Sequence, residues 1–341
     1  MISTIELSHG AGGLKADELL HEIQKIFTYR VTDEKSIGMD AFDDGAILNN
    51  FSGDLVITTD GHTVSPLEFP GGDIGSLAVS GTLNDVVMMG AQPLALTCAL
   101  IIEEGLPFVL LKRILLTMDV ICSQEKIPII AGDTKVVPKG KIDQLMVVTT
   151  GIGKRISNKP ILDSNVQLDD VIIVTGPVGT HGITLMSFRE GISFETDLKS
   201  DCASLASILV PLAKKYPIHA MKDPTRGGLA SAINEWASKS KVDIILKEEL
   251  IPIDPAVRTA AEMLGLDPLE ITCEGRAIIS VNKNISKEVL AFLKSHSSGL
   301  GKEAEIIGSV TSIGSKVFLE TSVGGLRRLQ KPLGELIPRV C

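Results

Sequence analysis

Five short segments of the sequence combine aspartate with glycine or a neighbouring amide, residue types that suit the ligation of metal-bound phosphates. They are Asp43-Asp44-Gly45-Ala46, Asp60-Gly61, Asn84-Asp85, Gly132-Asp133-Thr134-Lys135 and Asp223-Pro224-Thr225-Arg226. Magnesium prefers hard oxygen ligands and commonly shares them with phosphate, so carboxylates from several loops fit such a site. Together, the five segments indicate that the chain binds a nucleotide with its metal.

A structural role competes with this interpretation at each position taken alone. An aspartate before Pro-Thr is a good N-cap for a helix, and Asp-Gly is a common turn. Asp85 is the exception, because it falls in the middle of a predicted helix, where neither a cap nor an exposed turn is available. The recurrence of all five segments in glycine-rich surroundings favours function.

Two glycine-rich segments are further candidates for phosphate contact. Residues 8–13 (SHGAGG), which include Gly12 and Gly13, precede a predicted helix and either close over phosphates as a flap or are simply flexible. Residues 176–182 follow a strand and precede a helix, but they lack the Gly-Lys-Ser/Thr ending of a P-loop. The second segment alone indicates only a strand-to-helix turn.

The last residue, Cys341, closes a stretch that has no secondary-structure pattern. Pro332 and Pro338 stiffen this stretch, and Gly334 permits a bend. A chain end of this kind is free to swing, so its thiol can be loaded at one site and presented at another. The alternatives are a cysteine placed there by chance and a partner-docking peptide with an incidental thiol.

The composition limits the class of protein. The chain has 341 residues, a net charge of −9, 44% hydrophobic residues and 4% aromatic residues. The negative charge argues against nucleic acid or an anionic membrane surface as the main partner. Five dispersed cysteines form neither a disulfide framework nor a zinc site, and neither a signal peptide nor a membrane-spanning run is apparent. We expect a cytoplasmic protein with reduced thiols.

Alternating strand and helix patterns predict two α/β domains, residues 1–155 and 156–325, followed by a flexible tail over 326–341. In the first domain, strands are expected at 55–59, 94–102, 127–131 and 145–150, and helices at 74–89 and 108–123. In the second, strands are expected at 170–175, 276–282 and 305–310, and helices at 183–189, 202–216, 229–238 and 255–264.

Nine motifs, taken in order, resemble one family along essentially the whole chain. They are SHGAGG (8–13), DDGA (43–46), TTDG (58–61), SPLEFPGGDIG (65–75), GTLNDVVMMGAQP (81–93), AGDTKVV (131–137), KDPTRGGLA (222–230), CEGR (273–276) and PRVC (338–341). The set resembles the HypE family of hydrogenase-maturation carbamoyl dehydratases. That family lies within the ATP-binding superfamily of aminoimidazole ribonucleotide synthetase, selenophosphate synthetase and thiamine-monophosphate kinase. The acidic turns are common to the superfamily, whereas PGGDIG, GDTKVVP and the terminal Pro-Arg-x-Cys indicate the HypE family.

The resemblance implies a fold and a reaction. The expected fold is the two-domain aminoimidazole ribonucleotide synthetase-like α/β (α+β) fold, in which an N-terminal sheet domain pairs across a homodimer. ATP is expected near the domain and subunit interface. The expected reaction is the ATP-dependent dehydration of an S-carbamoyl group on the terminal cysteine to a thiocyanate. The carbamoyltransferase HypF loads the group, and the cyano group then passes to iron on the HypC–HypD complex.

The resemblance also implies roles for individual residues. Cys341 carries the substrate, Glu274 acts as general base, and Lys135 orients or polarises the carbamoyl group. The implied magnesium ligands are Asp44, Asp60, Asp85 and Asp223. The implied ATP-binding residues are the first three of these together with Gly12, Gly13, Asp43, Asn84, Asp133 and Thr134. Phosphorylating the carbamoyl oxygen makes it a good leaving group, and losing the N–H protons requires a base. Without the resemblance, Glu274-Gly275 is better interpreted as a solvated turn.

Two positions depart from the family pattern, and two other functions compete. Cys273 stands where the family has Asn and puts a second thiol near the proposed base, and Thr180 stands where Asp is common. A selenophosphate synthetase-like enzyme would carry a reactive cysteine in the N-terminal glycine-rich loop, and residues 10–15 contain none. A non-catalytic nucleotide-binding scaffold would bind ATP without turnover, which a measurement of steady-state hydrolysis distinguishes.

Overall fold

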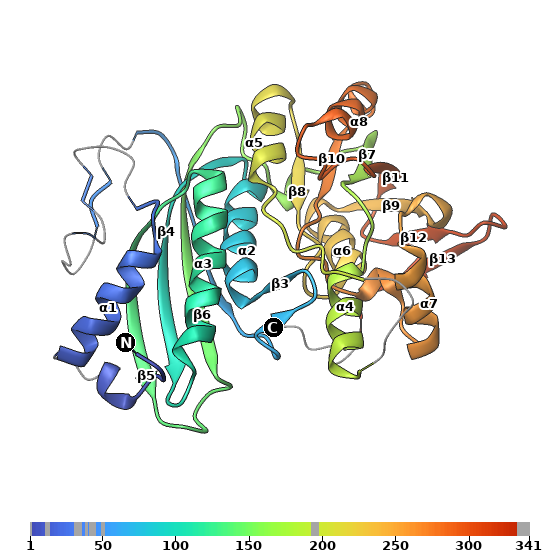
Figure 1. Cartoon of the computed structure of the whole chain (residues 1–341). Helices are drawn as coiled ribbons and strands as arrows, with labels where there is room; N and C mark the ends of the chain where they lie inside the picture. Colours follow the sequence, from blue (N-terminus) through green and yellow to red (C-terminus); the bar gives the residue numbers. More distant parts are fainter. Residues whose placement is uncertain are drawn as a thin grey trace.

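The computed structural model describes residues 2–10, 14–30, 36–37, 40, 46–48, 52–191 and 198–332. Two main sheets, each flanked by helices, form the molecule, which confirms the predicted two-part α/β fold (Figure 1). The helices are α1 (Leu14–Ile26), α2 (Ile74–Met88), α3 (Phe108–Glu125), α4 (Thr180–Arg189), α5 (Ala206–Lys215), α6 (Gly228–Ser240), α7 (Pro255–Leu264) and α8 (Ser286–Ser295). The strands are β1 (Leu55–His62), β2 (Glu68–Phe69), β3 (Gly72–Asp73), β4 (Ala91–Glu103), β5 (Ile129–Val137), β6 (Leu145–Arg155), β7 (Asp170–Val174), β8 (Ala220–Lys222), β9 (Val242–Lys247), β10 (Ile278–Asn282), β11 (Glu305–Ile313), β12 (Val317–Glu320) and β13 (Leu326–Leu329).

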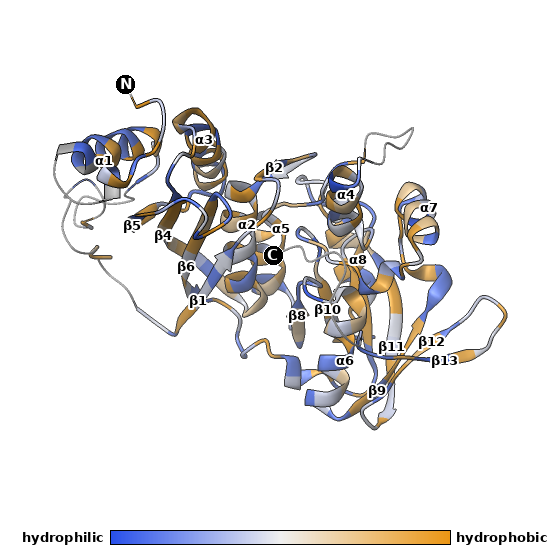
Figure 2. Ribbon diagram, turned by 90° about the horizontal axis from the view of Figure 1, so that it is seen from below, coloured by the Kyte–Doolittle hydropathy of each residue, from blue (hydrophilic) through white to orange (hydrophobic). Residues whose placement is uncertain are grey.

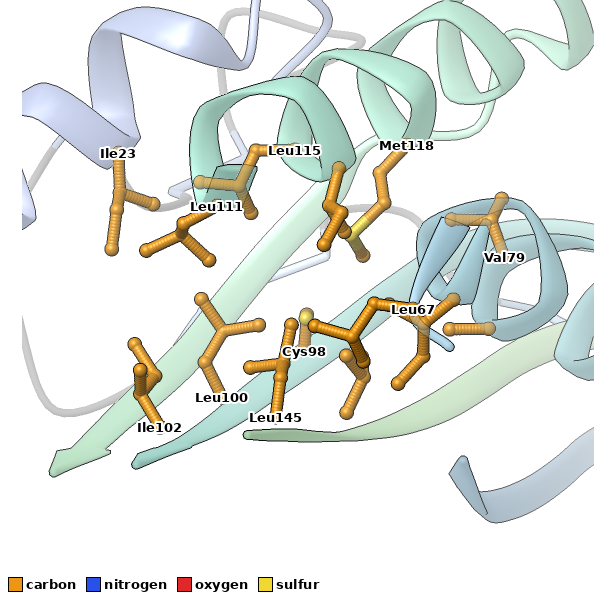
Figure 3. Packing of buried hydrophobic residues seen from close by; sticks show 14 of the residues in the cluster. Ile23, Leu67, Val79, Cys98, Leu100, Ile102, Leu111, Leu115, Met118 and Leu145 are labelled. Carbon is orange, nitrogen blue, oxygen red and sulfur yellow. The ribbon is translucent and has the colours of Figure 1, made fainter. Parts of the chain in front are cut away.

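The first sheet has the strand order β1-β6-β4-β5, antiparallel except for the parallel pair β4 and β5. Helices α2 and α3 cover one face, and no helix of the described ranges covers the other (Figure 1). Figure 3 shows Leu111, Leu115 and Met118 of α3 facing Cys98 and Leu145 of the sheet. Removing these apolar side chains from water stabilises the packing of helices on sheet.

Helix α2 runs through the middle of the molecule and is buried on nearly every side. The first sheet packs on one flank of the helix, and α5 and β8 of the second unit pack on another. The helix begins after Asp73, whose carboxylate accepts a hydrogen bond from the Ser76 N–H (2.8 Å), while the Ser76 hydroxyl accepts from the Asp73 N–H (2.9 Å). This capping box satisfies two N–H groups at the helix start. Polar residues inside such a helix need partners within the protein, which makes Asn84 and Asp85 informative.

The second sheet has the order β13-β12-β9-β11-β7-β10-β8. Helix α6 packs on one face through the fully buried Trp236, and α5 and α8 pack on the other. Strands β7 and β10 consist mainly of buried apolar residues, as expected for strands covered on both faces, and Figure 2 shows hydrophobic stretches along β9 and β11. The Trp236 indole N–H donates to Asp163 (2.8 Å), so the one polar atom of this side chain is satisfied.

Several element boundaries differ from those expected, and two of the differences affect the site. Strand β1 continues through Asp60, and β5 continues through Asp133 and Lys135, so these residues lie in strands where turns were expected. Pairing of β1 with β6, and of β5 with β4, extends each strand past its glycine. Helix α5 begins at Ala206, four residues later than predicted, because main-chain groups of the preceding segment are hydrogen-bonded to Asn84 of α2.

The sequence patterns gave no indication of β9, β12, β13 and α8. Strand β13 falls inside the segment assigned to the tail, and its Leu329 is 2% exposed because it packs in the core of the second sheet. The other bounds of the two domains and the tail remain predictions. No helix in the described ranges is long and apolar enough to cross a membrane.

Candidate active site

Three of the predicted metal ligands and the predicted base line one cavity between the two units. Asp60 lies on β1, Asp85 on α2, Asp223 directly after β8, and Glu274 in the loop before β10. The cavity has a volume of ≈ 150 Å³, and all four carboxylates border it. Residues separated by as many as 214 positions (274 − 60) are therefore brought together by the packing of α2 between the two sheets.

The Asp223 loop is fixed by close backbone packing. Gly228 has φ +58, and a Cβ added to it would lie 2.6 Å from the carbonyl oxygens of Leu269 and Ile271. Only glycine fits both the left-handed conformation and this approach. The loop that bears Asp223 is thus held against the segment that leads to Glu274.

The carboxylates of the cavity repel one another. Burial raises the pKa of Asp85, and the charges of Asp223 and Asp60 raise it further. Burial also raises the pKa of Asp223, with Asp60 adding to the effect. A bound cation would relieve this repulsion, so the donor set fits a divalent metal.

The described residues contain no group of three or more His, Cys, Asp or Glu side chains that would hold an ion alone. Mg²⁺ often takes only one or two carboxylates and completes its shell with phosphate oxygens and water. The three aspartates around the cavity therefore fit magnesium that is shared with a nucleotide.

A chain of buried hydroxyl groups supports the aspartate of β1. The Thr82 hydroxyl donates to Asp60 Oδ2 (3.1 Å) and lies 2.6 Å from the Thr149 hydroxyl, which in turn lies 3.2 Å from His62 Nε2. Because Thr82 gives its single proton to the carboxylate, it accepts from Thr149, whose hydroxyl also lies 3.3 Å from the Ala78 carbonyl. Thr82 therefore orients the Asp60 carboxylate, and Thr149 holds Thr82 in place.

Hydrogen bonds hold the loop of Glu274 at several points. The Glu274 N–H donates to Asp201 Oδ1 (3.2 Å), and the Thr272 hydroxyl donates to Glu274 Oε1 (3.3 Å). Arg276 faces the other oxygen of Asp201 at 3.6 Å. Burial, followed by the charges of Asp223 and Asp201, raises the pKa of Glu274 to about 8. A carboxylate with such a pKa is a stronger base than an ordinary one once it is ionised.

Asn84 lies beside Asp85 in the sequence, but its side chain points into the seam between the two units. It is 1% exposed. Its Oδ1 accepts from the Leu205 N–H (2.7 Å), and its Nδ2 donates to the Ala203 carbonyl (3.1 Å) and, at 3.5 Å, to the Glu274 carbonyl. It does not line the cavity that holds the carboxylates.

Asp133, Thr134 and Lys135 lie on β5, the edge strand opposite β1 in the first sheet. The register places Asp133 beside Ala99, and Lys135 beside Ile101, on the face that α2 and α3 do not cover. Asp60 projects from the covered face, because its pairing residue Thr149 is buried under α2. Within one chain, Asp133 and Lys135 are therefore not brought to the cavity.

Gly12, Gly13, Asp43, Asp44 and Cys341 lie outside the described residues. Their proposed roles as phosphate contacts, metal ligand and substrate carrier remain predictions.

Neither of the two departures from the family pattern lines the cavity. Cys273 is fully buried, and its Sγ accepts a hydrogen bond from the Gly179 N–H (3.1 Å). Burial raises its pKa well above the usual range, so it is a thiol. It borders the start of α4, not the cavity. Thr180 is 9% exposed, in the first turn of α4, and also lies away from the cavity.

The cavity includes residues that the sequence reasoning did not select. His62 and Arg226 line it together with Thr225. Arg226 and Thr225 belong to the motif KDPTRGGLA, whereas His62 directly follows the motif TTDG and is not part of it. Asp201, which holds Glu274, belongs to no quoted motif.

The last described residues lie beside this site. Lys331 pairs with Glu235 of α6 (Nζ–Oε1 2.8 Å), and Asn234 Nδ2 donates to the Leu329 carbonyl (3.2 Å). A Cβ added to Gly227 would lie 3.6 Å from Pro332 Cγ, so Pro332 is next to the Asp223 loop. Pro332, the last described residue before Cys341, thus lies close to the cavity.

The chain is similar to known proteins along nearly its whole length. Residues 42–154 match the AIR synthase related protein N-terminal domain, and residues 167–319 match the corresponding C-terminal domain. The chain is 43% identical to a putative hydrogenase expression/formation protein of Methanocaldococcus jannaschii, over 98% of both chains. It is 42% identical to the carbamoyl dehydratase HypE of Rhizobium leguminosarum bv. viciae, over 99% of this chain and 95% of that protein.

A solved structure is similar over the whole chain. The crystal structure of the hydrogenase maturation protein HypE in complex with ATP superimposes with a TM-score of 0.93 at 37% identity, and covers 99% of this chain and 100% of the other. Near-complete coverage at such identity extends to both domains and the seam between them. The chain belongs to the HypE family of carbamoyl dehydratases, within the AIR synthase related proteins.

Proposed function

We propose that this chain is a carbamoyl dehydratase of hydrogenase maturation, which uses ATP to convert an S-carbamoyl group on Cys341 into a thiocyanate. The observation that carries the proposal is the meeting of Asp60, Asp85, Asp223 and Glu274 on one cavity. Three carboxylates suit a metal–nucleotide complex, and the fourth is a base with a raised pKa. Family membership supplies the reaction class.

The first half of the reaction transfers the γ-phosphoryl group of ATP to the carbamoyl oxygen. Asp60, Asp85 and Asp223, joined by Asp44, would hold Mg²⁺, which neutralises phosphate charge when it is bound. The hydroxyl groups of Thr58 and Thr82 orient two of these carboxylates by donating to Asp85 and Asp60, each at 3.1 Å. Such orientation lowers the cost of reorganisation during phosphoryl transfer.

The second half removes phosphate from carbon and both protons from nitrogen. The C–O bond breaks, the nitrogen lone pair completes a C≡N bond, and the products are thiocyanate, ADP, phosphate and one proton in net. Glu274 is the base in this step. With a pKa of about 8 in the metal-free protein, its ionised fraction increases from neutral to mildly alkaline pH.

A homodimer completes the site. The uncovered face of the first sheet exposes Leu55 and Ile57 (51% and 59% exposed), beside apolar residues of β6 and β4. An apolar face of this extent favours association. Asp133 and Lys135 project from this same face, so pairing two copies through it offers a route for them to reach the cavity of the other copy.

HypF and the HypC–HypD complex are the proposed partners. A HypE–HypF crystal structure resembles this chain with a TM-score of 0.78 at 38% identity, which supports the first partner. The acceptor complex and a cytoplasmic location follow from the family reaction alone. ATP and Mg²⁺ are the proposed small-molecule requirements.

Mass spectrometry of the C-terminal peptide tests the proposal. The protein is incubated with HypF, carbamoyl phosphate and ATP, and the expected result is a carbamoyl adduct on Cys341 that loses one water. A non-hydrolysable ATP analogue should leave the carbamoyl adduct intact. An unmodified cysteine in the presence of demonstrably active HypF would refute the proposal and leave an ATP enzyme with another substrate.

A further inference from the structure

The side chain of Asn84 joins three segments that must keep a fixed spacing for the reaction. Its oxygen accepts from Leu205 N–H at 2.7 Å, and its nitrogen donates to the Ala203 carbonyl at 3.1 Å and the Glu274 carbonyl at 3.5 Å. Superfamily analogy assigns Asn84 to the nucleotide. We propose instead that Asn84 is a positioning residue that sets the place of Glu274 relative to Asp85.

The helix geometry separates the tasks of the two neighbours. Successive residues of an α-helix point about 100° apart, so Asp85 faces the cavity while Asn84 faces the second unit. Asn84 is 1% exposed and uses both its oxygen and its amino group on main-chain atoms. An amide with these bonds has both of its N–H groups engaged within the protein, and its burial keeps the oxygen from a nucleotide in the cavity.

A second side chain, that of Asp201, holds the main chain of Glu274 from the other side. Its main-chain N–H donates to the carboxylate of Asp201 (3.2 Å), and the side chain of Asp201 is 1% exposed. A Cβ added to Gly275 would lie 1.8 Å from the Asp201 carbonyl oxygen, so the two segments touch without room for a side chain. Both polar main-chain groups of Glu274 are therefore bound by side chains, Asp201 at the N–H and Asn84 at the carbonyl.

The contacts of Asp201 and of Asn84 with Glu274 both depend on one segment of the chain. Residues 201–205 supply Asp201 at one end and the Ala203 and Leu205 contacts of Asn84 at the other. This segment therefore sets the distance between helix α2, which carries Asp85, and the loop that carries Glu274. Because a base displaced by about 1 Å loses on the order of 100-fold in rate, the spacing controls proton removal and leaves nucleotide binding alone.

The inference rests on the proposed function only for its rate prediction. Asn84→Ala is compared with wild type and with Asn165→Ala, which removes an amide that donates to the Pro160 carbonyl away from the cavity (2.8 Å). Titration calorimetry with Mg–ATP should show a dissociation constant within about threefold of wild type. Conversion of carbamoyl to cyano on Cys341 in a single turnover should slow by at least about 30-fold. Asn165→Ala should change neither quantity.

A double variant that combines Asn84→Ala with Glu274→Gln tests whether Asn84 acts through Glu274. If Asn84 acts through Glu274, adding Asn84→Ala to Glu274→Gln should slow the reaction no further. A further loss, or an ATP dissociation constant that increases in step with the loss of rate, would overturn the proposal. An unchanged rate would do the same.

Hydrogen exchange separates failure of this inference from failure of the proposed function. In Asn84→Ala, the amides of residues 272–276 should exchange at least about tenfold faster, while those of β1 are unchanged. This readout applies even if wild type forms no thiocyanate, an outcome that would refute only the proposed function. Unchanged exchange at 272–276 would overturn the positioning role.

Discussion

The strongest test of the cavity electrostatics is the effect of Glu274→Gln on the pH dependence of stability. Burial and neighbouring carboxylates raise the pKa of Glu274 from 4.5 to about 8 in the folded protein. Between these values the folded protein holds a proton that the unfolded chain has released. Stability therefore decreases as pH rises through this window, and it is highest below the unfolded pKa.

The magnitude follows from one proton. Each pH unit inside the window lowers the free energy of unfolding by about 1.4 kcal/mol through this group. Glu274→Gln removes that contribution, so its stability curve should be flatter than that of wild type by this slope between about pH 5.5 and 7.5. At neutral pH the variant should be more stable than wild type and much slower, with a residual rate, because the group that destabilises the fold is the proposed base.

Urea unfolding of metal-free, nucleotide-free protein at several pH values measures this slope. Glu303→Gln, which removes an exposed carboxylate of the same domain, is the matched control. Parallel curves for Glu274→Gln and wild type would refute the electrostatic argument. Addition of Mg–ATP should reduce the slope in wild type, since cations in the cavity favour the ionised form of Glu274.

Three further predictions concern the metal, its support and the dimer. Asp85→Asn should weaken Mg–ATP binding at least about tenfold by calorimetry, because it removes a proposed metal ligand; unchanged binding would exclude Asp85 from the metal site. Thr149→Val should interrupt the hydrogen bonds from His62 to Thr82, lower the free energy of unfolding by about 1–2 kcal/mol in urea and weaken Mg–ATP binding; loss of stability with wild-type binding would show that the hydroxyl chain does not support the metal site. Ile57→Asp, on the uncovered sheet face, should give a monomer by light scattering, and a persistent dimer would place the interface elsewhere.

Much of the fold and part of the site were predictable from residue patterns. Helix α2 and strand β4 have long apolar runs, and the structure contains both near their expected positions. Strand β5 was cut short in the prediction because Gly132-Asp133 has the signature of a turn, and only its pairing with β4 continues the strand. The propensities of neighbouring residues do not show that a strand distant in the sequence will pair with this segment and extend it.

The site shows the same limit. Asp60, Asp85, Asp223 and Glu274 were selected from motifs, and the structure brings them to one cavity. The same motifs could not separate Asn84 from Asp85, because one turns towards the cavity and the other towards the seam. That distinction depends on the packing of residues 201–205 against α2, a contact between residues 121 positions apart.

The attachment of Pro332 beside the Asp223 loop limits where other proteins must act. Cys341 is the ninth residue after Pro332, so the thiol travels at most about 30 Å from this point. Within that radius the tethered thiol has an effective concentration in the millimolar range, far above that of a free competitor. Under the proposed function, the protein that loads the cysteine and the protein that unloads it both place their reactive centres inside this volume. One tethered thiol then reaches the loading site, the cavity and the unloading site from a single attachment point.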